Sequence, residues 1–268
     1  MLHLAFVDLL CCSIVPITKI PVLITHGRWV VGDFACRVLR PLLWMLTGCS
    51  GWILLGLCWD RCKAISQPLI NRFTRRQISL YCALCWFASC CLCIPYVWFS
   101  RSSSEEKKCY RLYSDHARVV LRYFDIIKDF LKGYIPITAM VVFLLKIYFA
   151  LKGRSAELMS TAGHLTLSQQ RNRVSVQRKL EKNTYFILLT TSAFIFCFLP
   201  STLLNCVVNL AFNDPPLFQL DATTLSYIDR ALAWAWALTY LNSAVNCFIY
   251  AGRFRDFQAF ILKTFRIV

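Results

Sequence analysis

Six long apolar segments run through the chain, separated by shorter segments that are rich in charged residues. They lie at about 1–25, 37–59, 78–99, 133–151, 184–211 and 229–251, and each is long enough for a helix to cross the roughly 30 Å hydrocarbon core of a bilayer. The chain of 268 residues is 57% hydrophobic and still 16% charged, as expected of membrane helices joined by polar loops. The sequence therefore predicts an all-α membrane protein, with a single transmembrane domain over residues 1–268.

The positive charges indicate how these segments are oriented. Lys and Arg greatly outnumber Asp and Glu in the linkers 60–77 and 152–183 and in the tail 252–268. Basic loops stay in the cytoplasm, so the C-terminus is expected there, in a multi-pass protein of the plasma membrane. Apolar and basic residues are interspersed in the tail, and this pattern predicts a short amphipathic helix at about 252–266.

The second apolar segment ends in a charged step. Residues 42–59 carry no ionised side chain, and Asp60 and Arg61 follow directly. A charge this close to the apolar core is costly unless it finds a partner or an aqueous edge. The step Asp60-Arg61-Cys62 resembles the Asp-Arg-Tyr motif at the inner end of the third helix of rhodopsin-like (class A) G-protein-coupled receptors, with Cys62 in place of Tyr.

Further motifs of that family follow at matching distances. Asp8 in LAFVDLL is similar to the Asp of the second helix, and Pro200 in FIFCFLP is similar to the Pro of the sixth helix. Residues 242–250, NSAVNCFIY, resemble the Asn-Pro-x-x-Tyr motif of the seventh helix. The resemblance covers the second to the seventh helix of the family. It implies a seven-transmembrane receptor bundle of a peptide-receptor-like branch, with the first helix missing from this chain.

The resemblance also assigns roles to individual residues. A disulfide is expected between Cys36 and Cys109, which flank membrane segments. The activation switch and G-protein contact would use Asp60, Arg61, Pro200, Asn246 and Tyr250. An inner Na⁺ pocket would use Asp8, Ser50, Asn242 and Asn246. A hard cation prefers such oxygen ligands, but an interhelical hydrogen-bond network without an ion would use the same residues.

The outer halves of the helices are expected to form a ligand pocket. By the register of the family, its residues are Arg40, Leu43, Trp44, Thr47, Lys128, Lys132, Phe198, Trp236 and Tyr240. The three cations among them favour a ligand with an anionic group, on a peptide or a lipid. The alternative is local pairing, because Asp125 and Asp129 each precede one of the two lysines by three residues.

The function implied by the resemblance is signal transduction. An extracellular ligand, peptide-like or anionic, would activate a heterotrimeric G protein in the cytoplasm. Four residues depart from the family's motifs, and they leave a non-signalling receptor-like partner as an alternative: Cys62, Leu144, Phe198 and Cys247. A small solute or ion transporter is a further alternative, although no internal repeat supports it.

Other function classes lack a pattern in the sequence. The chain contains no catalytic motif, and most of its cysteines lie in apolar runs, where they act as small hydrophobic residues; we therefore expect neither an enzyme nor a cofactor, apart from a structural Na⁺. The net charge of +16 would suit nucleic acid, but the basic residues lie between apolar runs rather than along one polar face. Membrane lipid, and not nucleic acid, is therefore the expected surrounding of the chain.

Overall fold

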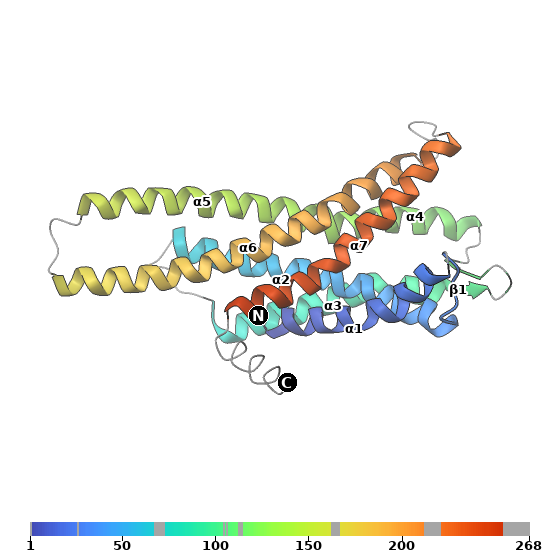
Figure 1. Cartoon of the computed structure of the whole chain (residues 1–268), viewed down its shortest axis with the longest axis horizontal. Helices are drawn as coiled ribbons and strands as arrows, with labels where there is room; N and C mark the ends of the chain where they lie inside the picture. Colours follow the sequence, from blue (N-terminus) through green and yellow to red (C-terminus); the bar gives the residue numbers. More distant parts are fainter. Residues whose placement is uncertain are drawn as a thin grey trace, which may run out of the picture.

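A computed structural model describes residues 2–25, 27–66, 73–103, 105, 107–111, 115–161, 167–211 and 221–253 of the chain. Long helices make up most of it (Figure 1). Two π-helical turns, η1 and η2, continue directly into the helices α2 and α5. In order, the elements are α1 (Leu2–Ile24), η1 (Ala35–Leu39), α2 (Arg40–Ser66), α3 (Arg75–Phe99), β1 (Ser100–Ser103), β2 (Lys108–Arg111), α4 (Asp115–Asp129), η2 (Phe130–Tyr134), α5 (Ile135–Thr161), α6 (Leu167–Ala211) and α7 (Ala222–Arg253).

The helix α2 lies at the centre of the bundle. It packs against α1, α3, α5 and α6, and its label in Figure 1 lies between theirs. Leu43, Leu46 and Leu54 on this helix are completely buried, as expected of a helix that is apolar on all sides. One end of α2 carries predicted ligand-pocket residues and the other end carries Asp60 and Arg61, so this helix connects the two candidate sites.

Close packing of α2 on α3 depends on a glycine. A Cβ atom added at Gly56 would collide with the ring of Tyr81 on α3. The Tyr81 hydroxyl donates a hydrogen bond to the Trp52 carbonyl at 2.6 Å. In lipid, no hydrophobic effect drives helices together, so they associate through close packing and hydrogen bonds. Small residues such as glycine allow the helices to approach closely enough for both.

Five helical stretches among the described residues are long and apolar enough to cross a membrane. They correspond to the first five predicted segments: Leu2–Ile24, Ala35–Ser66, Arg75–Phe99, Tyr123–Gly153 and Thr184–Asn209. The sixth segment, 229–251, lies within α7, which is helical but is not among the five. Its membrane crossing and the single-domain organisation stay predictions. The amphipathic helix expected at 252–266 lies outside the described residues, apart from the last two residues of α7.

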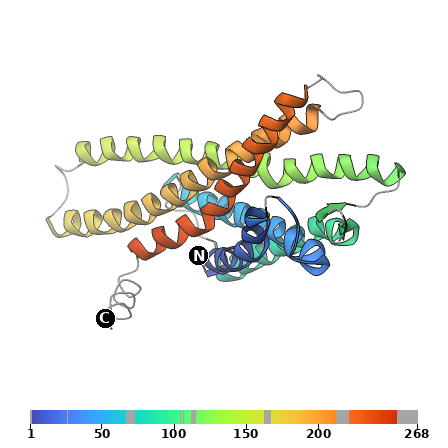
Figure 2. The ribbon, with the colours of Figure 1, turned by 45° about the vertical axis from the view of Figure 1, so that its right-hand side comes forward.

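Two helices extend beyond the apolar segments that predicted them. The helix α5 continues to Thr161, and α6 already begins at Leu167, whereas the segments were 133–151 and 184–211. Figures 1 and 2 show these extensions, in yellow-green and yellow, running beside each other past the rest of the bundle. Hydropathy alone identifies only the part of such helices that is apolar enough for lipid.

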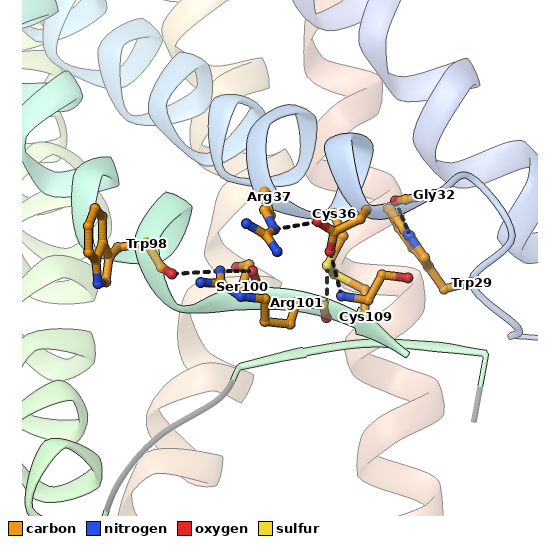
Figure 3. Close-up of polar contacts among 10 residues, drawn as sticks. Trp29, Gly32, Cys36, Arg37, Trp98, Ser100, Arg101 and Cys109 are labelled. Carbon is orange, nitrogen blue, oxygen red and sulfur yellow. Dashed lines mark hydrogen bonds and ion pairs between the residues drawn. A yellow bond between two sulfur atoms is a disulfide. The ribbon is translucent and has the colours of Figure 1, made fainter. Parts of the chain in front are cut away.

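A small β hairpin covers the opposite end of the bundle. β1 and β2 pair antiparallel, with Ser102 opposite Cys109. The predicted disulfide between Cys36 and Cys109 is present, with a Cα–Cα distance of 5.7 Å, and it joins η1 to β2 (Figure 3). Asp33 adds to this connection by accepting a hydrogen bond from the Ser102 amide at 2.9 Å. The hairpin is therefore held against the start of α2.

Candidate functional site

A cleft opens between α2, α3 and the α4–η2 segment, in the half of the bundle that carries the hairpin. The water-accessible space within this cleft is about 20 Å³, room for about one water molecule, and the cleft is partly open to the surface. Its walls include Trp44, Lys128 and Lys132, which were predicted to line the pocket, and Cys93 from α3. Aromatic and apolar walls with a few charged groups are typical of ligand sites.

The charge of Lys128 is compensated within the protein. Its ammonium group forms ion pairs with Asp125 at 3.3 Å and with Asp129 at 3.2 Å. It also lies 5.1 Å from the centre of the Trp44 ring and 4.8 Å from that of Tyr96. The Tyr96 hydroxyl in turn donates a hydrogen bond to Asp125. For Lys128, the structure therefore supports local pairing rather than a free cation for a ligand.

Lys132 has different surroundings. Its ammonium group lies 5.5 Å from the centre of the Trp236 ring on α7. Its aliphatic chain lies beside Gly48 of α2, where an added Cβ atom would be 3.3 Å from the Lys132 Cγ. Within the described part of the chain, no acidic side chain forms an ion pair with Lys132. The ammonium group of Lys132 therefore lies in the bundle interior against the ring of Trp236.

Of the two local pairs given as the alternative, Asp125–Lys128 is present, and Asp129–Lys132 is not an ion pair among the described residues. Asp129 pairs with Lys128 instead, because Phe130–Tyr134 form a π-helical turn. A π-helical turn is wider than an α-helical turn, so residues three apart no longer lie on one face. Lys132 lies beside Gly48 of α2 and Trp236 of α7, with Asp129 within electrostatic range but not in an ion pair with it among the described residues.

Arg40 supports the hairpin. Its guanidinium group donates a hydrogen bond to the Cys109 carbonyl at 2.9 Å and lies 5.6 Å from the centre of the Trp44 ring. Arg40 thereby connects α2 to the disulfide-bonded strand. The contacts of Arg40 with Cys109 and Trp44 therefore account for its position, and no ligand is needed to explain it.

The uncharged pocket residues belong largely to the core. Leu43, Phe198 and Tyr240 are part of the buried cluster, and Trp44 and Trp236 pack at its edge. The buried Thr47 hydroxyl donates to the Trp44 carbonyl on its own helix at 3.0 Å. These residues form the floor below the cations.

A lysine that the sequence did not single out lies against one of the predicted pocket residues. The ammonium group of Lys19, on α1, lies 5.3 Å from the centre of the Tyr240 ring. A lysine in an apolar segment is costly unless it reaches a partner or an aqueous cavity. Its position near the end of the first apolar segment was the available signal, but only the structure shows which ring it meets.

The inner polar cluster contains a completely buried carboxylate. Asp8 accepts a hydrogen bond from the Asn246 side-chain amide at 3.2 Å, between α1 and α7. Ser50 and Asn242 are also buried. The side-chain oxygens of Ser50, Asn242 and Asn246 have no hydrogen-bond partner among the described residues. Neutral oxygens beside a carboxylate fit a hard cation such as Na⁺; in the described part of the chain, no group of three His, Cys, Asp or Glu could hold a metal.

The end of α2 that lies away from the hairpin contains the residues predicted to form the switch. Arg61 and Asp60 form an ion pair at 2.9 Å, and both side chains are half-buried. Cys62 is buried beside Ile65 of α2 and Ile147 of α5. The cysteine that stands in place of the family's Tyr thus packs between two helices. Tyr250 lies in α7, but its side chain is outside the described residues.

A hydrogen bond connects α6 and α7 beside Pro200. The hydroxyl groups of Ser201 and Thr239 are 2.8 Å apart, and the Thr239 hydroxyl lies 3.3 Å from the Cys197 carbonyl. Pro200 has no amide hydrogen, which loosens one turn of α6. Contacts to α7 therefore flank the weakest point of α6 on both sides.

These features define a class of protein: a membrane bundle with a narrow cleft of aromatic and cationic side chains at one end and a charged step at the other. The family described as "7 transmembrane receptor (rhodopsin family)" matches residues 1–250. The chain belongs to this family. Members of the family are receptors that bind ligands and signal through G proteins, and they cross the membrane several times, which confirms the receptor class, the fold class and the multi-pass placement predicted from sequence.

Individual relatives are distant. The chain is 24% identical to the C5a anaphylatoxin chemotactic receptor 1 of Danio rerio, with 100% of this chain and 70% of the relative covered. It is 26% identical to the protein of the same name from Oncorhynchus mykiss, with 99% and 70% covered. It is 26% identical to the cysteinyl leukotriene receptor 1 of Cavia porcellus, with 75% and 55% covered.

Proposed function

We propose that this receptor responds to an extracellular ligand with an anionic group, peptide-like or lipid-like, and activates a heterotrimeric G protein at the plasma membrane. The observation that carries this proposal is the position of Lys132. Its ammonium group is inside the bundle, in a cleft with aromatic walls, without an ion pair in the described part of the chain. A carboxylate, sulfate or phosphate supplies the missing hydrogen-bond acceptor. The names of the relatives, C5a and cysteinyl leukotriene receptors, agree with ligands larger than monoamines.

The proposed mechanism is a shift of population between two states of the bundle. Ligand binding near Trp236 favours a state in which α6 bends at Pro200, breaking its contact with Thr239. The Asp60–Arg61 pair then separates, and Arg61 contacts the G protein from a cytoplasmic position. A ligand shifts the equilibrium only by its difference in affinity for the two states, so the G protein must reciprocally increase ligand affinity.

We further propose that the inner polar cluster binds Na⁺. The supporting observation is the set of buried neutral oxygens around the Asp8–Asn246 pair. Such an ion would stabilise one arrangement of α1 against α7. Among the chain's own residues, Asp8 supplies the negative charge, and Ser50, Asn242 and Asn246 supply neutral oxygens.

The proposal is tested by G-protein dissociation in living cells exposed to a pooled library of peptides and acidic lipids. We expect a ligand-dependent signal, lost in Arg61→Ala and reduced at least roughly tenfold in potency by Lys132→Gln, because a charge-assisted hydrogen bond is removed. Arg230→Gln is the matched control, since Arg230 lies over Tyr227 on the exposed outer part of α7. A signal that is unchanged in Lys132→Gln at equal surface expression would contradict the assignment of Lys132.

A non-signalling receptor-like partner is the second candidate. The observation that favours it is Cys62, which is buried between α2 and α5 where the family's motif has Tyr. Silence of the wild-type chain towards every ligand, with signalling gained in Cys62→Tyr, would favour this candidate. Because the chain belongs to a receptor family, no observation favours a transporter or an enzyme.

A further inference from the structure

Two lysines from different elements lie against the same aromatic pair on α7. Trp236 and Tyr240 are one turn apart, with ring centres 6.2 Å apart and planes inclined by 28°. Lys132 of η2 lies 5.5 Å from the first ring, and Lys19 of α1 lies 5.3 Å from the second. The result is a row of four groups in the order cation, ring, ring, cation, which we call the lysine–aromatic row.

The two cations in this row share an electrostatic property. In the described part of the chain, neither Lys19 nor Lys132 forms an ion pair through its ammonium group, and each lies over an aromatic ring. Lys19 also lies within electrostatic range of Arg40, so positive charge accumulates on its side. A cation–π contact stabilises an ammonium group by about 0.5–2 kcal/mol, but it leaves the three N–H donors without acceptors.

The other cations of the cleft are already engaged. Lys128 is paired with two carboxylates, and Arg40 donates to the Cys109 carbonyl. Neither needs a ligand to satisfy its charge or donors. Of the three cations expected from the sequence to bind the ligand, only Lys132 is therefore still available. Lys19 on α1, a residue that the sequence did not assign to the pocket, is a second available cation.

We propose that Lys19 and Lys132 bind two separate anionic groups of a single ligand. The apolar spacer between these groups lies along Trp236, which is only partly buried, since flat aromatic faces bury apolar chains well. A dicarboxylate, or an amphiphile with two acidic groups, has the required chemistry. This inference rests on the proposed function, because Lys132 belongs to both, and it adds the second anionic group and Lys19.

The inference is tested on the full chain, purified in lipid nanodiscs without G protein. The probes are linear dicarboxylic acids of increasing length and their half-methyl esters, which keep the length but lose one negative charge. Binding is measured by isothermal titration calorimetry. We expect one length to bind best, and we expect its half-ester to bind roughly tenfold to a hundredfold more weakly, as for loss of one charge-assisted contact.

Variants separate the two lysines. Lys19→Gln is expected to weaken the best dicarboxylate roughly tenfold and to leave the half-ester unchanged, whereas Lys132→Gln weakens both. Lys19→Arg keeps the charge and retains dicarboxylate affinity, which distinguishes a lost contact from misfolding. Arg230→Gln removes a cation from an exposed tyrosine on the same helix, 4.8 Å from its ring, and serves as the matched control with no expected effect.

The outcomes distinguish the two proposals. If Lys132→Gln weakens both probes while Lys19→Gln changes neither, the two-cation site is overturned and the proposed anionic-ligand function stands. If Lys132→Gln has no effect on any probe, the anionic-ligand function fails together with the inference. If no dicarboxylate of any length binds better than its half-ester, a site for two anionic groups is ruled out.

Discussion

The contact between Ser201 and Thr239 determines how easily α6 bends at Pro200. The substitution Thr239→Val keeps the shape of the side chain and removes its hydroxyl group. It deletes the 2.8 Å contact to Ser201 and the weaker 3.3 Å contact to the Cys197 carbonyl. Both contacts cross from α6 to α7 on buried residues, so water does not replace them.

The magnitude follows from measured interhelical hydrogen bonds. One such bond within a membrane contributes about 1 kcal/mol, which is roughly a fivefold change in an equilibrium constant. If bending of α6 breaks the contact, Thr239→Val raises the population of the bent state about fivefold in the absence of ligand. The assay is ligand-independent G-protein dissociation in cells, normalised to surface expression.

A second deletion tests the same bond from its other end. Ser201→Ala is expected to raise basal signalling to a similar extent, and the double variant no further, because both changes remove one interaction. Basal signalling that stays at the wild-type level in Thr239→Val would refute the reasoning. So would a double variant whose effect is the sum of the two single effects.

Three further predictions concern packing, ion binding and the end of α7. Gly56→Ala should destabilise the bundle by about 2 kcal/mol because the new methyl group collides with Tyr81; thermal unfolding, followed by a thiol-reactive dye on the buried free cysteines, measures this. Asp8→Asn should abolish the effect of Na⁺ on agonist affinity, measured by ligand binding over a sodium titration. Hydrogen bonds from Thr223, then Thr224, lower the pKa of Asp221 from 3.8 to about 2. Because the ionised carboxylate accepts these bonds, they stabilise the start of α7 above a pH of about 4, and this stabilisation is lost as the pH falls to about 2. Hydrogen exchange of the first α7 amides measures the loss.

Each of these predictions has its own control. Gly153→Ala should leave the unfolding temperature unchanged, because nothing lies within 4 Å of an added Cβ there; equal melting of both glycine variants would contradict the packing argument. An Na⁺ effect that persists in Asp8→Asn would leave only an interhelical hydrogen-bond network. Asp221→Ala should lower the protection factors of the first α7 amides at pH 7 and remove their change between pH 4 and 2, and protection equal to that of the wild type would exclude the cap.

The sequence predicted those features that depend on apolar length and on motif spacing. Apolar runs identify five membrane helices because lipid excludes charge over a fixed thickness. The Cys36–Cys109 bridge followed from the family's spacing, and the structure confirms it. The contact of Asp8 with Asn246 joins two residues that are 238 positions apart in the sequence. The family's register predicted that these two residues would lie in one cluster, whereas composition alone could not have predicted it.

The pairing of the cations was harder to predict. Residue spacing placed Asp129 beside Lys132, but the π-helical turn over Phe130–Tyr134 changes which residues share a face. No residue type marks such a turn in the sequence. Lys19 was visible as a charge in an apolar segment, but its contact with Tyr240 depends on how α1 packs against α7. The chemistry of a pocket is therefore determined by helix register and packing, which hydropathy does not encode.

The central claim is that one bundle couples the outer cleft to the cytoplasmic switch at Arg61. The most direct test measures the affinity of an activating ligand for the chain in nanodiscs, with and without nucleotide-free G protein. The claim predicts tighter ligand binding when G protein is present, and no such increase in Arg61→Ala, because coupling between two sites is reciprocal. Equal affinity in both conditions for the wild-type chain would contradict it.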